Sequence, residues 1–196
     1  MKLGIMGGTF NPPHLGHLRA AQTAKERLKL DKVLFIPTNI PPHKLLPKDT
    51  ARPEQRCEMV RLMTQNLPWA ELSEIEIERG GASYTVETLR ELVARGYDDI
   101  TLIVGTDMLL SFDSVWREPQ EICRLCTLAV CARNVGEKDE IAEKEMQLKE
   151  MYRAHIVVLE TDPFPISSTE LRKSGKLHGY VPQAVEDYIL CHRLYR

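Results

Sequence analysis

Two histidines near the beginning of the chain, His14 and His17, have a type and spacing that suit phosphate chemistry. They follow a turn, residues 7–13, that starts with two glycines and ends with two prolines. Prolines favour the first turn of a helix, and residues three apart share one helix face, so both imidazoles are expected to point the same way. Glycines let an anion approach peptide N–H groups, and a helix start attracts negative charge. The segment therefore predicts a phosphate-binding turn beside two imidazoles.

Two other interpretations of this segment stay open. A Gly-Gly turn is common, and a histidine on a helix is more often structural than catalytic. A His-x-x-His pair also supplies two ligands to some metal ions, but no third carboxylate or histidine stands at motif spacing here. A helix start is moreover an unfavourable place for a cation. We therefore expect no metal ion held by protein ligands at this turn.

A second candidate anion site lies near the other end of the sequence. Ser167 and Glu170 have capping-box spacing, which predicts the start of a helix, and Arg172 follows one turn into it. The hydroxyls, the helix N–H groups and the guanidinium would together form a cradle for the β- and γ-phosphates of a nucleoside triphosphate. The alternative is a well-capped helix without a ligand.

The hydrophobic pattern alternates between short apolar runs and longer amphipathic stretches. Buried strands are predicted at 3–6, 32–36, 100–104, 127–131 and 155–159, with a further candidate at 70–78. Helices are predicted at 14–30, 52–65, 85–95, 137–152 and 182–191. This alternation predicts an α/β fold with a Rossmann-like, doubly wound, mainly parallel sheet and helices on both faces. Ligands of such sheets bind beyond the carboxyl ends of the strands, which selects the loops that begin at Gly7, Thr38 and Gly105 and the stretch 165–172.

The size and charge of the chain restrict its partners. Its 196 residues suit one domain, residues 1–196, with a substantial core. The formal net charge is -2, so neither nucleic acid nor an anionic membrane is an expected partner. No apolar run has the roughly 20 residues of a membrane span, and the first residues lead into a strand and not into a signal peptide. We expect a cytoplasmic protein, and a homo-oligomer stays open.

The five cysteines are scattered along the chain, and their odd number suits reduced thiols. Cys123 and Cys126 have Cys-x-x-Cys spacing, which raises zinc binding or redox chemistry as an alternative. They stand in a helical pattern, whereas a structural zinc site normally takes four ligands in paired knuckles. We therefore expect small hydrophobic side chains that pack as free thiols.

Together, the strand, the glycine-rich turn and the His-x-Gly-His helix start resemble the first signature of the HxGH nucleotidyltransferase superfamily. The segment 166–172 looks like its second signature. The resemblance implies that His14, His17 and Arg172 are catalytic and that ATP binds with Mg²⁺. In this superfamily a phosphate oxygen of the acceptor attacks the α-phosphorus of ATP, and pyrophosphate leaves without a covalent enzyme intermediate. The residues implied to bind ATP are Gly7, Gly8, Thr9, Phe10, His14, His17, Gly105, Asp107, Ile166, Ser167, Ser168 and Arg172.

Four internal features resemble the family of bacterial nicotinate mononucleotide adenylyltransferases, and this resemblance extends over essentially the whole chain. Asp107 follows a predicted strand, where the resemblance implies hydrogen bonds from ribose hydroxyls. Trp116 would stack on a pyridine ring, and backbone amides near Thr85 would meet the nicotinate carboxylate. On the loop after 32–36, Asn39 and Lys44 would bind the acceptor phosphate. Arg133, which follows the strand predicted at 127–131, would bind the same phosphate.

Each of these residues also has an ordinary structural interpretation. Asp107 could cap a helix, as could Thr85 or its neighbour Ser83, and a tryptophan commonly packs into a core. Lys44 alone would be taken as solvent-exposed. The sequence also departs from the family pattern, because Arg133 is not followed by Pro-Gly and because Arg117 stands where an aromatic residue is common. A cationic side chain at 117 would attract a carboxylate.

The resemblance implies transfer of AMP from ATP to nicotinate mononucleotide, which gives deamido-NAD in NAD biosynthesis. Three alternatives remain. Nicotinamide mononucleotide differs from the nicotinate form by one group, and backbone donors serve either. Phosphopantetheine adenylyltransferases share the first turn and the Ser-Ser-Thr segment, but they tend to be shorter and lack the features around Thr85 and Asp107. A nucleotide-binding regulator without catalysis would not require His14, His17, and Arg172 together.

Overall fold

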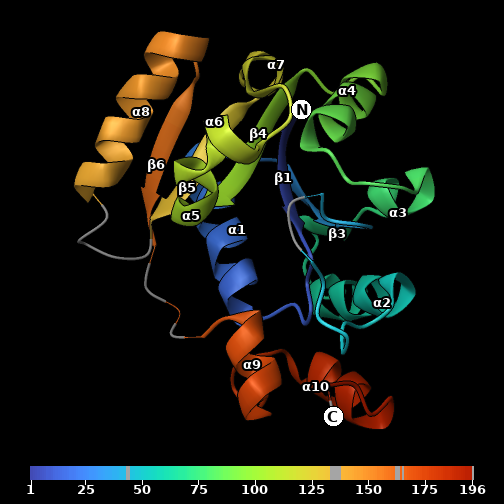
Figure 1. Ribbon diagram of the computed structural model, residues 1–196. Helices are drawn as coiled ribbons and strands as arrows, with labels where there is room; N and C mark the ends of the chain where they lie inside the picture. Colours follow the sequence, from blue (N-terminus) through green and yellow to red (C-terminus); the bar gives the residue numbers. More distant parts are fainter. Residues whose placement is uncertain (43–44, 133–137, 162–163, 165, 196) are drawn as a thin grey trace. The chain divides into compact units, whose positions relative to one another are not determined.

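The computed structural model describes residues 1–42, 45–132, 138–161, 164 and 166–195. Its strands form a six-stranded sheet in the order β3-β2-β1-β4-β5-β6 (Figure 1). Their bounds are Lys2–Gly8 (β1), Lys32–Pro37 (β2), Ala70–Leu72 (β3), Asp99–Gly105 (β4), Thr127–Ala132 (β5) and Ile156–Glu160 (β6). The strand order reverses between β1 and β4, which is the topological switch point of a doubly wound sheet. The predicted Rossmann-like α/β fold is confirmed.

Helices are interleaved with these strands along the chain (Figure 1). Before β4 they are Leu15–Leu28 (α1), Pro53–Thr64 (α2), Ile75–Arg79 (α3) and Thr85–Ala94 (α4). After β4 they are Thr106–Leu110 (α5), Phe112–Val115 (α6), Pro119–Leu125 (α7), Lys138–Tyr152 (α8), Ser168–Ser174 (α9) and Gln183–Cys191 (α10). None of the helices in the described part of the chain is both long and apolar enough to cross a membrane.

The chain divides into two compact units. The first comprises Met1–Met6, Ala20–Val33 and Tyr84–Pro163, and the second comprises Gly7–Arg19, Leu34–Ser83 and Phe164–Arg196. Each unit combines segments that are distant in sequence. One domain over residues 1–196 stays a prediction.

In the first unit, β1, β4, β5 and β6 pair in parallel, with Leu3 opposite Ile100 and Leu102 opposite Leu128. Residues 100–104 of β4 and 128–132 of β5 are all buried. Successive strand residues point to opposite faces, so consecutive burial means that both faces of these strands are covered. The apolar runs of the sequence correspond to these doubly covered strands.

The second unit contains α2, whose buried residues recur at helical spacing. Met59, Val60 and Met63 lie on this buried face together with Arg56. Phe10 and Phe35 add an aromatic contact with ring centroids 6.1 Å apart. A charged residue in the apolar face of a helix requires polar partners, because an unpaired buried charge is strongly unfavourable.

The strand predicted at 70–78 is wrong beyond its first three residues. The strand β3 ends at Leu72, and the Ser73 N–H donates to the Phe35 carbonyl at 2.9 Å. Residues 75–79 then form α3, which buries the consecutive residues Ile75 and Glu76. The alternation of isoleucine and glutamate is typical of a strand, but an alternating strand would expose Glu76, which is buried in α3.

Candidate functional site

The glycine pair of the first loop lies at the end of β1, in the second unit. Neither Gly7 nor Gly8 adopts a positive φ, so the backbone angles that only glycine favours are not used at these two positions. The left-handed residue of this loop is Phe10, with a φ of 48°. A Cβ placed on Gly7 would meet no atom within 4 Å, which leaves open space beside the chain. The glycine therefore permits close approach to the backbone.

His14 and His17 lie against each other, with ring centroids 3.8 Å apart. The His14 N–H donates to Nδ1 of His17, and the Gly16 N–H donates to Nδ1 of His14, both at 3.1 Å. An Nδ1 atom that accepts a hydrogen bond carries no proton, so the proton of each neutral ring is on Nε2. Both imidazoles are thereby held in the tautomer that presents Nε2–H as a donor. The two rings therefore lie together, as the sequence predicted.

Gly16 is required by the packing of His14. A Cβ at this position would lie 2.9 Å from Cε1 and Nδ1 of His14 and 2.9 Å from a ring carbon of Phe164. Phe164 stacks on the His14 ring at 5.8 Å with an interplanar angle of 8°. The glycine between the histidines thus lets the first ring fold back over the helix start.

The main-chain N–H groups around the start of α1 already have partners within the protein. The N–H groups of His14 and Gly16 donate to the two imidazoles, and that of His17 donates to the His14 carbonyl at 2.9 Å. The Leu15 N–H donates to the Tyr180 carbonyl at 2.8 Å. These N–H groups fix the two imidazoles and dock the start of the helix.

The helix α9 begins with the predicted capping box. Ser167 is its N-cap: the Ser167 hydroxyl accepts from the Glu170 N–H at 3.2 Å, and the Ser167 N–H donates to the Glu170 carboxylate at 2.7 Å. The Ser167 hydroxyl also donates to the Glu170 carboxylate at 2.7 Å, and this bond, followed by that from the Ser167 N–H, lowers the pKa of Glu170. The preceding residue, Ile166, donates its N–H to the Phe164 carbonyl at 2.9 Å.

Two side chains of α9 hold the first loop. The Ser168 hydroxyl donates to the Pro12 carbonyl at 2.8 Å, and Nη1 of Arg172 donates to the Asn11 carbonyl at 2.5 Å. Arg172 also lies 3.9 Å from the Asp49 carboxylate. The second signature of the sequence is therefore brought against the first, as the prediction of a shared phosphate site requires.

Asn11 and Tyr195 belong to this arrangement, although the sequence did not single them out. The Asn11 amide oxygen accepts from the Tyr195 hydroxyl at 2.8 Å and from the Ala51 N–H at 3.0 Å. Asn11 is buried, and its Nδ2 donates to the Thr50 hydroxyl at 3.3 Å. Burial raises the pKa of Tyr195, so this hydroxyl stays protonated and acts as a donor. No local pattern could have joined residues so far apart.

The loop after β2 carries Asn39, predicted to bind the acceptor phosphate. Its N–H donates to the Ser83 hydroxyl at 2.9 Å, and its Nδ2 donates to the Gly81 carbonyl at 3.0 Å. Ser83 is thus bonded to this loop and does not cap a helix. The predicted partners Lys44 and Arg133 lie outside the described residues.

In the first unit, Gly105 and Asp107 lie where β4 passes into α5. Gly105 is the N-cap of α5, and Asp107 is exposed in the first turn. The alternative that Asp107 caps the helix is therefore wrong. An exposed carboxylate at the carboxyl end of a central strand matches the predicted position for ribose recognition.

Thr85 and Trp116 also lie in the first unit. Thr85 is the first residue of α4, whose N-cap is Tyr84 without a side-chain cap bond, so capping by Thr85 is wrong. Trp116 packs its ring against Phe112 at 5.2 Å and is only half-buried. Arg117 lies over the Tyr84 ring at 4.6 Å.

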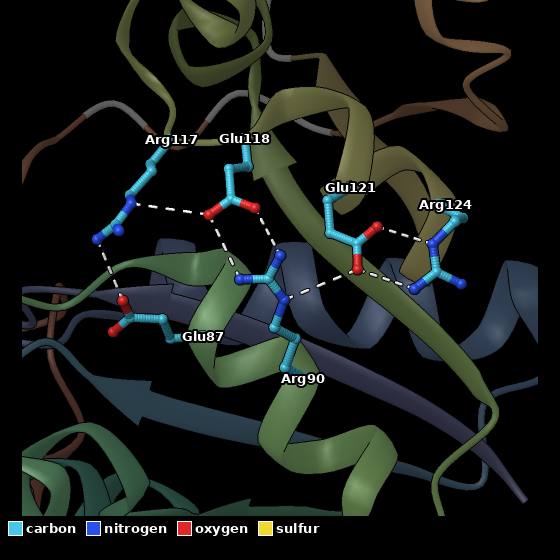
Figure 2. Close-up of polar contacts among 6 residues, drawn as sticks. All are labelled: Glu87, Arg90, Arg117, Glu118, Glu121 and Arg124. Atoms are coloured by element: carbon cyan, nitrogen blue, oxygen red, sulfur yellow. Dashed lines mark hydrogen bonds and ion pairs between the residues drawn. The ribbon is translucent and has the colours of Figure 1, made fainter.

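Arg117 belongs to an exposed network of ion pairs that links α4 with the start of α7 (Figure 2). Its Nη1 is 3.2 Å from the Glu87 carboxylate, and its Nε is 3.7 Å from Glu118. Arg90 contacts Glu118 at 2.5 Å and Glu121 at 3.7 Å, and the hydrogen bond from Arg90 lowers the pKa of Glu118. The positive charge of Arg117 is therefore balanced by carboxylates of the protein.

The thiols and the carboxylates of the described residues do not form a metal centre. No group of three or more His, Cys, Asp or Glu side chains in this part of the chain could hold a metal ion. All five cysteines are free, and burial raises the pKa of Cys123 to about 11 and that of Cys126 further. Neutral, buried thiols are poor metal ligands and poor nucleophiles.

The fold and the paired signatures define a nucleotidyltransferase, and the chain belongs to the cytidylyltransferase-like family, whose model matches residues 5–174. Within it, the chain belongs with the proteins named probable nicotinate-nucleotide adenylyltransferase. The protein of that name from Dictyoglomus thermophilum is 40% identical over 200 residues, covering 100% of both chains. Its counterpart from Geotalea daltonii is 37% identical over 214 residues, covering 100% of this chain and 98% of its own.

Solved structures of similar proteins have the same fold. Nicotinic acid mononucleotide adenylyltransferase of Plasmodium falciparum, complexed with NaAD, superposes with a TM-score of 0.78 at 17% identity and covers 99% of this chain and 97% of its own. A putative nicotinate-nucleotide adenylyltransferase from Vibrio parahaemolyticus gives a TM-score of 0.62 at 21% identity, with coverage of 97% and 99%. At these identities, the likeness concerns the fold alone.

Proposed function

We propose that the protein is a nicotinate-nucleotide adenylyltransferase. It transfers the adenylyl group of ATP to nicotinate mononucleotide, which gives deamido-NAD and pyrophosphate in NAD biosynthesis. The observation that carries the proposal is the histidine pair, in which two imidazoles 3.8 Å apart are fixed as Nε2–H donors beside an open glycine loop. The full-length likeness to proteins of that name supports the acceptor.

The reaction is a direct displacement at the α-phosphorus. A phosphate oxygen of nicotinate mononucleotide attacks, the new P–O bond forms, and the bond to pyrophosphate breaks. A phosphate monoester is largely a dianion at neutral pH because its second pKa is about 6, so the nucleophile needs no general base. The protein therefore has to position the two substrates and to stabilise the charge that moves to the leaving group.

His14, His17 and Arg172 supply this stabilisation. The two Nε2–H groups donate to oxygens of the transferring phosphate, and the guanidinium faces the leaving pyrophosphate. Donors that are already oriented do not have to reorganise as the charge develops, which is why preorganised groups accelerate such reactions. The hydrogen bonds at both Nδ1 atoms provide that orientation.

Magnesium enters as part of the donor substrate. Mg²⁺ usually keeps several waters and is held by one or two carboxylates together with substrate phosphates. The phosphates of ATP would supply ligands to the ion. MgATP is the species that we expect to bind.

The acceptor is recognised by the remaining predicted residues. Backbone amides near Thr85 meet the nicotinate carboxylate, and Trp116 stacks on the pyridine ring. Asn39, Lys44 and Arg133 bind the acceptor phosphate, while Asp107 accepts hydrogen bonds from ribose hydroxyls.

The test is a pyrophosphate-release assay with ATP and one of three acceptors: nicotinate mononucleotide, nicotinamide mononucleotide or phosphopantetheine. We expect the highest kcat/KM with nicotinate mononucleotide. Release with phosphopantetheine alone would replace the acceptor but keep adenylyl transfer. Release with none of the three would overturn the proposal in favour of a nucleotide-binding regulator.

A further inference from the structure

Arg56 of α2 is a buried guanidinium whose hydrogen-bond partners in the described part of the chain are all backbone carbonyls. The residue is only 1% exposed to solvent. Nη1 donates to the Thr38 carbonyl at 2.7 Å and to the Thr9 carbonyl at 2.9 Å. Nε donates to the Ala51 carbonyl at 3.2 Å, and Nη2 donates to the Asn39 carbonyl at 3.4 Å.

Three of the four carbonyl partners come from two loops with predicted ligand roles. Thr9 belongs to the glycine loop, and Thr38 and Asn39 begin the loop predicted to bind the acceptor phosphate. The Thr38 N–H also donates to the Gly8 carbonyl at 2.9 Å. The two loops are therefore joined by this main-chain bond and also by Arg56, which donates to carbonyls of both loops.

The charge of Arg56 is compensated by dipoles. Within the described residues no carboxylate forms an ion pair with it, and burial lowers its pKa. An arginine nevertheless stays protonated in proteins, so four carbonyl dipoles have to stabilise a full charge. Burying a charge in this way costs more free energy than burying an apolar side chain of similar size. Stability of the fold alone is therefore a weak explanation for an arginine at this position.

The bonds also set the direction of the peptide groups. In a trans peptide the N–H points away from the C=O of the same unit. Because the Thr9 carbonyl points to Arg56, the N–H of Phe10 points to the opposite side. The Asn39 carbonyl orients the N–H of Ile40 in the same manner. Arg56 thus fixes the orientation of one peptide group in each of the two loops.

We propose that Arg56 is a positioning residue for adenylyl transfer, which fixes the separation and peptide orientation of the glycine loop and of the loop that begins at Thr38. This inference rests on the proposed function. Its effect is exerted through the backbone, and Arg56 itself touches neither substrate. In-line attack depends on the relative placement of donor and acceptor, and a displacement of about 1 Å lowers turnover by roughly a hundredfold.

The test compares Arg56→Lys and Arg56→Gln with Arg61→Lys. A lysine keeps the charge but places its donors on one atom, and a glutamine keeps two donors without charge. Arg61 is the matched control on the same helix, since it is exposed and pairs with Glu58 and Glu74. Pyrophosphate release is measured with both substrates varied, well below the melting temperature of each variant.

We expect both Arg56 variants to lower kcat by roughly ten- to a hundredfold. We expect each KM to change by less than about threefold, and Lys to retain more activity than Gln because it keeps the charge. Arg61→Lys should match the wild type. A lower melting temperature with unchanged kcat would overturn the positioning role. An inactive wild type and an inactive Arg61→Lys would instead overturn the proposed function, and this inference with it.

Discussion

The imidazoles of His14 and His17 show how a short motif prepares donors for a reaction. Each ring gives up its Nδ1 atom to a main-chain N–H of the same turn, which leaves the proton on Nε2. The orientation of both rings is therefore fixed by hydrogen bonds from the backbone of the same turn. A histidine pair of this kind suits transfer between phosphates, where no proton has to be removed from the nucleophile.

Separate His14→Ala and His17→Ala variants are expected to lower kcat by roughly a hundred- to a thousandfold each, because one oriented donor to the developing charge is lost. The KM for ATP should change far less. Steady-state kinetics at saturating nicotinate mononucleotide measures both constants. Near-normal turnover in both variants would contradict the assigned role.

Gly16→Ala is expected to impair activity without destabilising the helix. Alanine is favoured over glycine within a helix by about 1 kcal/mol, but its Cβ would lie 2.9 Å from the His14 ring. The ring must then move and lose its bond from the Gly16 N–H. Pyrophosphate release should fall at least about tenfold, while the melting temperature measured by calorimetry stays close to that of the wild type. Full activity would show that the reaction does not require the position of the His14 ring against Gly16.

At the scale of elements, two adjacent serines at the start of α9 make different bonds. Ser167 caps the helix, and Ser168 bonds to the first loop. Ser167→Ala removes the N-cap acceptor and should lower the free energy of unfolding by about 1 kcal/mol. Ser168→Ala removes the donor to the Pro12 carbonyl and should raise the KM for ATP by roughly five- to tenfold, about the worth of one hydrogen bond. Urea unfolding and kinetics on both variants test this division. Equal effects of the two substitutions on KM would contradict it.

The helices α6 and α8 are joined by a half-buried ion pair. Lys144 Nζ lies 2.5 Å from the Asp113 carboxylate, and this bond lowers the pKa of Asp113. A carboxylate with a lowered pKa in the folded state stabilises above its unfolded pKa of about 3.9, and this contribution is lost as the pH falls through the folded pKa.

Asp113→Asn should therefore reduce the free energy of unfolding by about 1 kcal/mol at pH 7. The difference from the wild type should shrink below about pH 4. Urea unfolding at several pH values measures it. The control is Glu160→Gln, which breaks the exposed pair with Lys138 and should have a smaller effect. A difference that does not depend on pH would contradict the ion-pair explanation.

At the scale of the whole molecule, binding of MgATP should raise the melting temperature. At 100 times its dissociation constant the ligand adds about 2.7 kcal/mol to the free energy of unfolding. For a chain of this size this corresponds to roughly 5 to 11 °C. Differential scanning calorimetry measures the shift, with magnesium chloride alone as the control. An equal shift with magnesium alone would indicate a metal site held by the protein.

The sequence predicted the sheet because its strands are apolar on both faces, as 100–104 and 128–132 are in the structure. It did not predict α5 and α6, which have five and four residues and are too short to show a helical period. The histidine pair and the capping box are local patterns and were predicted correctly as geometry. Their roles toward ligands, and those of Lys44 and Arg133, stay predictions.

The residues that the sequence did not reveal act over long distances along the chain. Arg56 lies on the same helix face as the buried residues Met59, Val60 and Met63. A charged residue on an apolar face was the sequence signal that could have singled it out. Tyr195 gave none, because its partner Asn11 is 184 positions away. Patterns over a few residues register periodicity and caps, whereas such partners are set by tertiary packing.

The hydrogen bond between Tyr195 and Asn11 also has a consequence for the order of assembly on the ribosome. Chains are elongated at about 5–20 residues per second, so roughly 10 to 40 s pass between the synthesis of these two residues. Arg172 and Ser168, which also hold the loop, are made only shortly before Tyr195. The loop that contains Asn11 is thus translated long before the residues that hold it, so its bonds to Ser168, Arg172 and Tyr195 form only after Tyr195 has been made.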